Sequence, residues 1–393
     1  MYYRLSKPLK SNSFFVFGAR GVGKTTLLNN LFKDTDSVYW VNLLDNQIYT
    51  NSLKNPNWLD EKISALTKKP DWVVIDEVQR SPQTLNTVHK LIEEKKIKFA
   101  LTGSSARKLK KVSANLLAGR ALMNYLHPLT CYELADQFDL NNTLNFGSLP
   151  YIVNSNDELT KKEILKSYIA TYLREEIKEE QIIRQLDPFV RFLDVAAQHN
   201  GKIINAAKIG RESQTDTSSI IRYFEILTDT LLGFFLEPYH TSVRKIQSAK
   251  AKFYFFDIGI KRALENSLDS KVVPQTYAYG NNFEHFFILE CIRLNDYYRK
   301  NYKFYYANTK DGVEIDLIVQ FPDKKIWSIE IKSSSKINAA DFGYNLKLSN
   351  DLKAKKFIVA CQEKESRITS EKIEIHNWKT VLDMLFFGDR RSE

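Results

Sequence analysis

Short apolar runs alternate with amphipathic stretches over the first 135 residues of the chain. The runs read FFVFG, VYWVNL, WVVIDE and KFALTG, and helical patterns separate them. Short buried strands alternating with helices are typical of a parallel sheet with crossover helices. We therefore expect residues 1–135 to form an α/β domain.

The pattern changes three times after that point. Residues 136–186 contain KKEILKSYIATYLREEIKEEQIIR, with apolar positions three and four apart, which predicts a helical lid or linker. Residues 187–275 show three short helical patterns followed by strands. Residues 276–393 begin with the helical NNFEHFFILECIRL and continue with alternating strands, which predicts a second, smaller α/β domain. The fold class is thus α/β and multidomain.

Composition narrows the class of protein without settling its function. A chain of 393 residues with 43% hydrophobic and 26% charged residues is globular and too long for one core. No apolar run reaches the roughly 20 residues of a membrane span, and the N-terminus has no apolar segment of a signal peptide. The cysteines lack metal or disulfide spacing, so we expect a cytoplasmic protein. They are Cys131, Cys291 and Cys361.

The net charge of +10 favours an anionic partner such as DNA, through neutralisation of phosphates. Lysines scattered over the surface for other reasons are an equal alternative. Charge alone does not decide between the two.

A glycine-rich loop follows the first apolar run and opens a helix. FGARGVGKTTLL matches the pattern G-x-x-x-x-G-K-[ST], in which backbone N–H groups cradle phosphates and the helix N-terminus favours anions. We expect Lys24 to reach the β- and γ-phosphates and the hydroxyl of Thr25 to hold Mg²⁺. The expected nucleotide-binding residues of the loop are Gly18, Gly21, Gly23, Lys24, Thr25 and Thr26.

Two further strands end in candidate catalytic residues. In DWVVIDEVQR, Asp76 is expected to hold Mg²⁺ with Thr25, and Glu77 to orient or deprotonate the attacking water. Ser104, after KFALTG, is either a γ-phosphate sensor or the N-cap of the next helix. Arg120 is either an arginine finger offered to a neighbouring subunit of a homo-oligomer or a surface ion pair. Glu77 favours hydrolysis over binding alone.

With these motifs in order, the chain resembles a prokaryotic family of AAA-type ATPases. The resemblance rests on FGARGVGKTTLL, VVIDEVQRSP, LTGSSARKL, LLAGR and LHPLTCYEL, and continues through YIATYLREEI, AKFYFFDIGI, GNNFEHFFILE, VEIDLIV and IEIKSS. It implies an AAA-type core, a helical lid, a winged-helix module and a C-terminal domain of unknown function with a PD-(D/E)XK, restriction-endonuclease-like fold. It also implies ATP as the nucleotide, which the loop alone does not distinguish from GTP.

The middle segment, residues 187–275, predicts a helix-turn-helix whose third helix spans about 216–228. Its exposed face would offer Ser218, Ser219 and Arg222, and the following hairpin carries basic residues that could contact phosphates. Packing against protein is the alternative use of such a module. These hairpin residues are Arg244, Lys245, Lys250 and Lys252.

The C-terminal motif SIEIKSS places a carboxylate and an amine on one face of a strand. The resemblance implies that Glu284 of the helix, Asp316 of the preceding strand, and the pair Glu330 and Lys332 surround a metal ion. Asp316 and Glu330 would share Mg²⁺ or Mn²⁺, lowering the pKa of a bound water, and Lys332 would position that water or stabilise developing charge. A solvated strand face with exposed charges is the competing interpretation.

The sequence indicates two alternative functions. The first is an ATP-hydrolysing protein that acts on DNA, with a metal-dependent nuclease-like domain. The second is an ATP-driven regulatory switch that binds a protein partner and uses the C-terminal domain as a non-catalytic scaffold. No membrane association is expected in either case.

Overall fold

The structure is a computed structural model that describes residues 2–35, 37–105, 119–173, 186–239 and 250–388. The chain divides into two compact units. Unit 1 contains Met1–Leu129 and Ile226–Leu232, and unit 2 contains Thr130–Glu225 and Gly233–Glu393. The predicted division into 1–135, 136–186, 187–275 and 276–393 stays a prediction.

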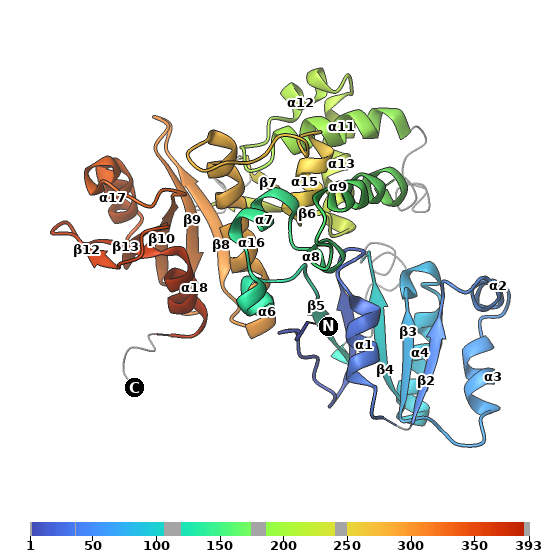
Figure 1. Ribbon diagram of the computed structural model, residues 1–393. Coiled ribbons are helices and arrows are strands. Elements are labelled where there is room, and N and C mark those ends of the chain that lie inside the picture. The colour runs from blue at the N-terminus through green and yellow to red at the C-terminus, as the bar shows by residue number, and fades with distance from the viewer. Residues whose placement is uncertain (1, 36, 106–118, 174–185, 240–249, 389–393) are drawn as a thin grey trace. The chain divides into compact units, whose positions relative to one another are not determined.

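A five-stranded sheet with the order β2-β3-β4-β1-β5 forms the centre of unit 1 (Figure 1). All four strand pairs are parallel, as the alternating pattern predicts. The strands are β1 (Ser13–Phe17), β2 (Val38–Asn42), β3 (Trp72–Asp76), β4 (Lys98–Gly103) and β5 (Ala121–Tyr125). The helices are α1 (Lys24–Leu31), α2 (Asn46–Lys54), α3 (Trp58–Ser64), η1 (Val78–Arg80) and α4 (Thr84–Lys95).

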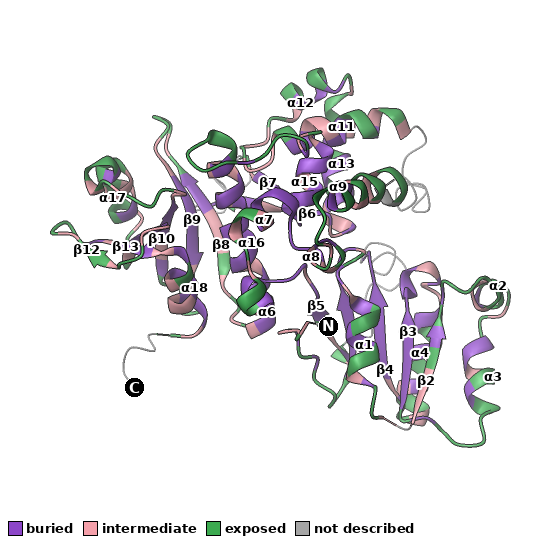
Figure 2. Ribbon diagram, in the orientation of Figure 1, coloured by how far each residue is buried: buried purple, intermediate pink, exposed green. Residues whose placement is uncertain are grey.

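Helices cover both faces of this sheet because its central strands are apolar on both sides. Strands β1, β3 and β4 are buried almost throughout (Figure 2). On one face, Phe15 joins the core that α3 and α4 close. On the other, Phe14 stacks on Phe32 just beyond α1, with ring centroids 6.5 Å apart. The carboxyl ends of β1, β4 and β3 therefore meet at one sheltered edge.

Unit 2 begins with helices. They are α6 (Cys131–Leu134), η3 (Ala135–Gln137), α7 (Leu140–Phe146), α8 (Pro150–Val153), α9 (Glu158–Ser167), the π-helix η4 (Tyr168–Leu173), α11 (Leu186–Gln198), α12 (Ala206–Glu212) and α13 (Thr217–Asp229). The last residues of α13, from Ile226 on, are assigned to unit 1. The predicted third helix at about 216–228 corresponds to α13. Within the described residues, none of the helices combines the length and apolar composition needed to cross a bilayer.

An eight-stranded mixed sheet with the order β12-β13-β11-β10-β9-β8-β6-β7 follows. Its strands are β6 (Gly233–Pro238), β7 (Lys252–Phe255), β8 (Lys303–Asn308), β9 (Glu314–Gln320), β10 (Ile326–Ile331), β11 (Lys356–Cys361), β12 (Arg367–Ile368) and β13 (Ile373–Asn377). The pairing of β6 with β8 joins strands from either side of the boundary predicted at residue 275. The sheet is therefore continuous across that boundary.

Four helical elements accompany this sheet: α15 (Ile258–Leu264), α16 (Tyr277–Tyr298), α17 (Gly343–Asp351, preceded by η5 at Ala339–Phe342) and α18 (Trp378–Phe386). Helix α16 packs on α18, where the rings of Phe286 and Trp378 lie 5.1 Å apart. Leu346 of α17 packs against a cluster that includes Phe357 and Val359 of β11. Helix α16 also lies against β10.

A buried carboxylate ties the helical part of unit 2 to its sheet part. Asp257, at the end of β7, accepts hydrogen bonds from the N–H groups of Ser148 (2.9 Å) and Ile260 (3.2 Å). Gly147 lies directly beside Asp257 with φ 75° and ψ −163°, a backbone conformation that residues other than glycine avoid. A Cβ at this glycine would lie 2.0 Å from Asp257 Oδ1.

We expect Gly147→Ala to lower the free energy of unfolding of unit 2 by at least about 3 kcal/mol, because it adds backbone strain and displaces a hydrogen-bonded carboxylate. Gly312→Ala is the matched control, since Gly312 has φ 85° but no atom within 4 Å of a Cβ. The control substitution should lower the free energy of unfolding by only about 1–2 kcal/mol, because it adds only the strain of a left-handed backbone. Urea denaturation followed by tryptophan fluorescence measures both, and equal losses would contradict the close approach to Asp257.

Candidate functional site

The phosphate loop joins β1 to α1, as its sequence predicts. Gly23 is the N-cap of α1 and has φ 96°, so the loop needs a residue without a side chain there. Lys24, only 5% exposed, donates from Nζ to the carbonyl oxygens of Gly18 (2.9 Å) and Ala19 (3.2 Å). The lysine thus lies folded over the loop, with Gly21 in the bend and Thr26 exposed in the first helical turn.

Helix α1 and strand β4 each bring a hydroxyl group to Asp76. Thr25 Oγ1 donates to Asp76 Oδ2 at 2.6 Å, and Thr102 of β4 donates to Asp76 Oδ1. The hydroxyl of Thr102 also accepts from the N–H of Glu77 at 3.0 Å. Carboxylate and hydroxyl oxygens are ligands that Mg²⁺ prefers, so Thr25 and Asp76 together fit the predicted magnesium position.

Glu77 is buried and held by several donors. Its backbone is left-handed, with φ 59°, which is uncommon for a residue other than glycine and is found at functional sites. Gln79 Nε2 donates to Glu77 Oε2 and also to Ser104 Oγ at 2.8 Å. Ser104 Oγ lies 3.2 Å from the same carboxylate oxygen, and Lys24 Nζ lies 3.9 Å from Oε1. The predicted base and sensor therefore share one network.

This network keeps Glu77 ionised. Burial raises the pKa of the Glu77 carboxyl, but the positive charge of Lys24 and the hydrogen bond from Gln79 outweigh it, so the pKa is lowered. A carboxylate of this kind can accept a proton from water.

Arg120 forms an ion pair with Glu93 of α4. This contact agrees with the surface-ion-pair interpretation and leaves the finger as a prediction. The helix that Ser104 was expected to cap lies outside the described residues.

The C-terminal motif residues lie together at the ends of β9 and β10. The two strands are antiparallel, with Leu317 opposite Ile329, so Asp316 and Glu330 face each other. Lys332 Nζ is 2.7 Å from Glu330 Oε1 and 3.9 Å from Asp316 Oδ2. Because Asp316 and Glu330 are only 7% and 4% exposed, the interpretation as a solvated strand face is wrong.

The two carboxylates differ in how their oxygens are used. Asp316 Oδ2 accepts from the N–H of Ile331 at 2.8 Å. Glu330 Oε2 is buried and finds no hydrogen-bond partner in the part of the chain that the structure describes. Burial and the adjacent charge of Asp316 raise the pKa of Glu330 to about 8. An unpartnered buried carboxylate oxygen is costly, and a cation would satisfy it.

Glu284, on α16, is held by residues of β7 rather than by Asp316 or Glu330. Tyr254 donates its hydroxyl to Glu284 Oε1 at 2.6 Å, and Lys252 Nζ lies 3.5 Å from the same oxygen. Lys252 also donates to Glu314 Oε1 at 2.5 Å. Burial raises the pKa of Glu284 despite the nearby lysine.

The prediction that Lys252 offers its charge to DNA phosphates from a surface hairpin is therefore wrong. The residue is 3% exposed, and it neutralises carboxylates inside unit 2. Arg244 and Lys245 lie outside the described residues, and Lys250 is exposed.

Within the described ranges, no group of three or more histidine, cysteine, aspartate or glutamate side chains is arranged to hold a metal ion. Asp316 and Glu330 thus form a two-carboxylate site. Their free oxygen atom makes the pair fit one cation, with other ligand positions left to water or substrate.

The carboxylate of Asp216 caps the N-terminus of the expected recognition helix, α13. Asp216 Oδ1 accepts from Ser218 Oγ and, at 2.9 Å, from the N–H of Ser219. Ser218 and Arg222 are exposed and Ser219 is half-buried. The exposed polar face of α13 therefore exists but carries few charges.

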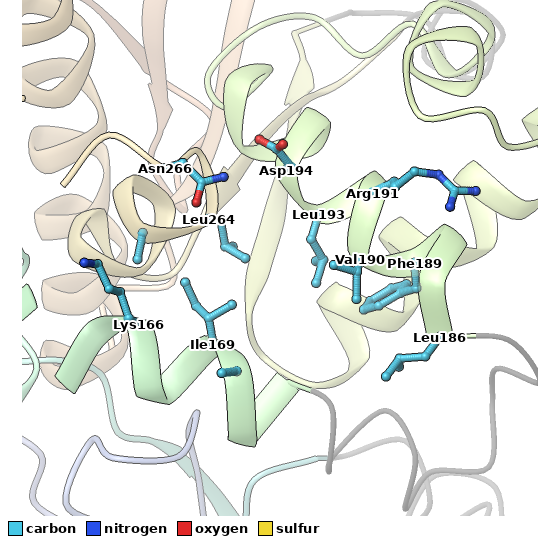
Figure 3. A pocket seen from close by; sticks show the side chains of 12 residues that line it. Lys166, Ile169, Leu186, Phe189, Val190, Arg191, Leu193, Asp194, Leu264 and Asn266 are labelled. Atoms are coloured by element: carbon cyan, nitrogen blue, oxygen red, sulfur yellow. The ribbon is translucent and has the colours of Figure 1, made fainter. Parts of the chain in front are cut away.

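A cavity of about 400 Å³ lies elsewhere in unit 2, between η4, α11 and α15 (Figure 3). Ile169, Leu193 and Leu264 point into it, and Lys166 and Asp194 lie at its rim. None of the residues that line it belongs to a predicted site.

Comparison with known proteins covers most of the chain in three parts. Residues 10–135 match the family model of an AAA domain, which confirms an AAA-type domain there and supports ATP binding. Residues 137–271 and 279–380 match two domains of unknown function, DUF8612 and DUF4143.

Two similar proteins carry the name uncharacterized protein. One from Mycobacterium tuberculosis is 24% identical over 321 residues, covering 81% of this chain and 69% of that protein. One from Methanocaldococcus jannaschii is 27% identical over 262 residues, covering 60% of this chain and 58% of that protein.

Solved structures are similar only in part. Domain III of the Thermotoga maritima replication initiation protein DnaA has a TM-score of 0.26 at 20% identity, covering 44% of this chain and 85% of that one. A half-complex of Thermococcus gammatolerans McrB AAA+ hexamers with bound McrC has a TM-score of 0.24 at 11% identity, covering 66% and 75%. Scores this low carry no weight for function.

We expect Thr102→Val to lower the free energy of unfolding of unit 1 by about 2–3 kcal/mol, because it leaves Asp76 Oδ1 and the Glu77 N–H without their buried partner. Thr87→Val is the control, since this buried threonine donates only to the carbonyl of Pro56. It should cost about 1 kcal/mol. Urea denaturation compares the two, and a control as damaging as Thr102→Val would show that the hydroxyl at the strand end is not special.

Proposed function

We propose that this chain is an ATP-hydrolysing AAA-type protein that acts on DNA, with a C-terminal site that binds a divalent cation for phosphodiester chemistry. The observation that carries the proposal is the convergence of Lys24, Asp76 and Glu77 at the carboxyl edge of the unit 1 sheet. The matched AAA domain supports nucleotide binding, and ATP is the expected nucleotide.

The chain's own groups suit hydrolysis of the terminal phosphate. Loop N–H groups and Lys24 bind the phosphates. Glu77 takes a proton from water while the oxygen of that water bonds to the γ-phosphorus. The bond between the γ-phosphorus and its bridging oxygen then breaks, yielding ADP and phosphate. Mg²⁺, held through Thr25 and Asp76, would neutralise phosphate charge.

Ser104 and Arg120 are proposed to sense and stabilise the γ-phosphate. Ser104 is suited to sensing because Gln79 links it directly to Glu77. Arg120 acts as a finger only in a homo-oligomer, where it exchanges Glu93 for a neighbouring subunit's nucleotide.

The C-terminal site supports phosphodiester hydrolysis by position and charge. Asp316 and Glu330 would hold Mg²⁺ or Mn²⁺, which lowers the pKa of a bound water. Lys332, half-exposed beside both carboxylates, can contact the scissile phosphate. Water adds to phosphorus as one P–O ester bond breaks, leaving a phosphate monoester and a hydroxyl. These contacts support a PD-(D/E)XK, restriction-endonuclease-like assignment.

Contact with DNA is proposed through α11, α12, α13 and the β6–β7 hairpin as a winged helix. The helices pack through Phe192 and Phe224, whose rings lie 4.9 Å apart, and strand β7 pairs with β6. Arg222 is the exposed cation of the third helix.

One observation favours the alternative, an ATP-driven switch that uses unit 2 as a non-catalytic scaffold for a protein partner. Glu284 Oε1 is bound by Tyr254 and Lys252, so this carboxylate of the expected nuclease set is already held by protein donors.

We expect Lys24→Ala to abolish ATP binding and hydrolysis, because it removes the cation that faces the phosphates. Glu77→Gln should keep ATP affinity within about threefold and lower kcat at least about 100-fold, since the base is lost. Phosphate release and nucleotide titration measure these effects, with the exposed Glu94→Gln as control. Normal turnover in Glu77→Gln would contradict its role.

We expect single-stranded, duplex or branched DNA to be cleaved in the presence of Mg²⁺ or Mn²⁺, and Asp316→Ala with Lys332→Ala to abolish cleavage. The control is Asp323→Ala with Lys325→Ala, which removes an exposed ion pair from the turn of the same hairpin. Adding or omitting ATP reports coupling between the two sites. No cleavage of any substrate would contradict the nuclease assignment and leave the scaffold function.

A further inference from the structure

Lys252 is a buried cation that the proposed reaction does not use. It is the first residue of β7, is 3% exposed, and has no role as a surface contact. A lysine is buried to this extent only when its charge is compensated. The compensating groups are the carboxylates of Glu314 and Glu284, with Nζ–Oε1 distances of 2.5 and 3.5 Å.

The lysine occupies the space between these two carboxylates. Tyr254, two residues further along β7, donates to the same Oε1 of Glu284. That oxygen is therefore bound by two protein donors, and Glu314 Oε1 is bound by one. A divalent cation could not ligate these atoms without displacing the ammonium group.

A different carboxylate oxygen is buried and has no hydrogen-bond partner among the described residues. It is Oε2 of Glu330, which lies opposite Asp316 on the neighbouring strand. Among the described residues here, four carboxylates face two lysines, Lys252 and Lys332. Fully ionised, the group keeps two negative charges, which one divalent cation compensates. A second divalent cation would leave a net charge of +2, against +1 where the Lys252 ammonium is absent.

From this arrangement we infer that Lys252 acts as a built-in cation, which takes the place of a second metal ion and limits the C-terminal site to one divalent cation at Asp316 and Glu330. A second ion beside Glu284 and Glu314 would be repelled by the ammonium at short range in a site of low dielectric. The inference rests on the proposed metal site and specifies its stoichiometry.

The test counts Mn²⁺ bound to the nucleotide-free full chain, by electron paramagnetic resonance of the free ion. Asp316→Ala measures binding elsewhere, which is subtracted. We expect one Mn²⁺ for the wild type and two for Lys252→Met, which keeps the length of the side chain without its charge. The two ions should give a spin-coupled signal. Lys356→Met, which breaks the ion pair with Glu374 on another strand, should keep one.

A second measurement tests the inference if Lys252→Met folds poorly. Mn²⁺ should raise the melting temperature of this variant more steeply than that of the wild type, because two ions then bind the folded state. If Lys252→Met folds only with Mn²⁺, while Lys356→Met folds without it, the inference is also supported.

Two Mn²⁺ in the wild type, or one in Lys252→Met with an unchanged melting response, would overturn the inference and leave the metal site intact. Equal binding by the wild type and Asp316→Ala would overturn both the proposed metal site and the inference.

Discussion

Carboxylates taken out of water at strand ends are the constraint on which both candidate sites depend. A buried charge is tolerated only when donors and opposite charges compensate it. In unit 1, Lys24, Gln79 and Ser104 compensate Glu77. In unit 2, Lys332 binds Glu330, and Lys252 binds Glu284 and Glu314. The two sheets act as rigid supports for these carboxylates, because a fixed backbone holds the compensating donors in place.

The two sheets solve this placement differently. In unit 1, the parallel strands β1, β3 and β4 end at one edge of the sheet. The phosphate loop, the carboxylates of Asp76 and Glu77, and the polar end of β4 therefore lie close together. In unit 2, an antiparallel hairpin sets Asp316 opposite Glu330, and a backbone N–H of β10 fixes the aspartate. The first arrangement presents a cradle for phosphates. The second presents a carboxylate oxygen with no partner.

Local patterns pointed to these groups because their geometry is local, and the roles of the groups stay predictions. The glycine-rich loop specifies its own turn, and a two-residue spacing on a strand aligns Glu330 with Lys332. Gln79 was not predicted, since its reach to Glu77 depends on a left-handed residue that the sequence does not mark. Lys252 was assigned wrongly because it pairs with a residue 62 positions away, through a strand that joins the second sheet from the preceding segment. Its neighbour Tyr254, spaced for the same face of the strand, is the signal that could have indicated a buried role.

Compensation by the chain's own lysines also bears on how each site takes up its ligand. Lys24 already lies on the loop carbonyls, and Glu77 already has donors at Oε2 and the Lys24 ammonium 3.9 Å from Oε1. Phosphate binding would therefore exchange the partners of Lys24 and Glu77, which are already out of water, so these two groups would add little further desolvation penalty. Freed from Lys24, Glu77 Oε1 would turn to water while Gln79 keeps Oε2 in place. The same logic applies in unit 2, where Lys332 can leave Glu330 for a phosphate only if another cation takes its place.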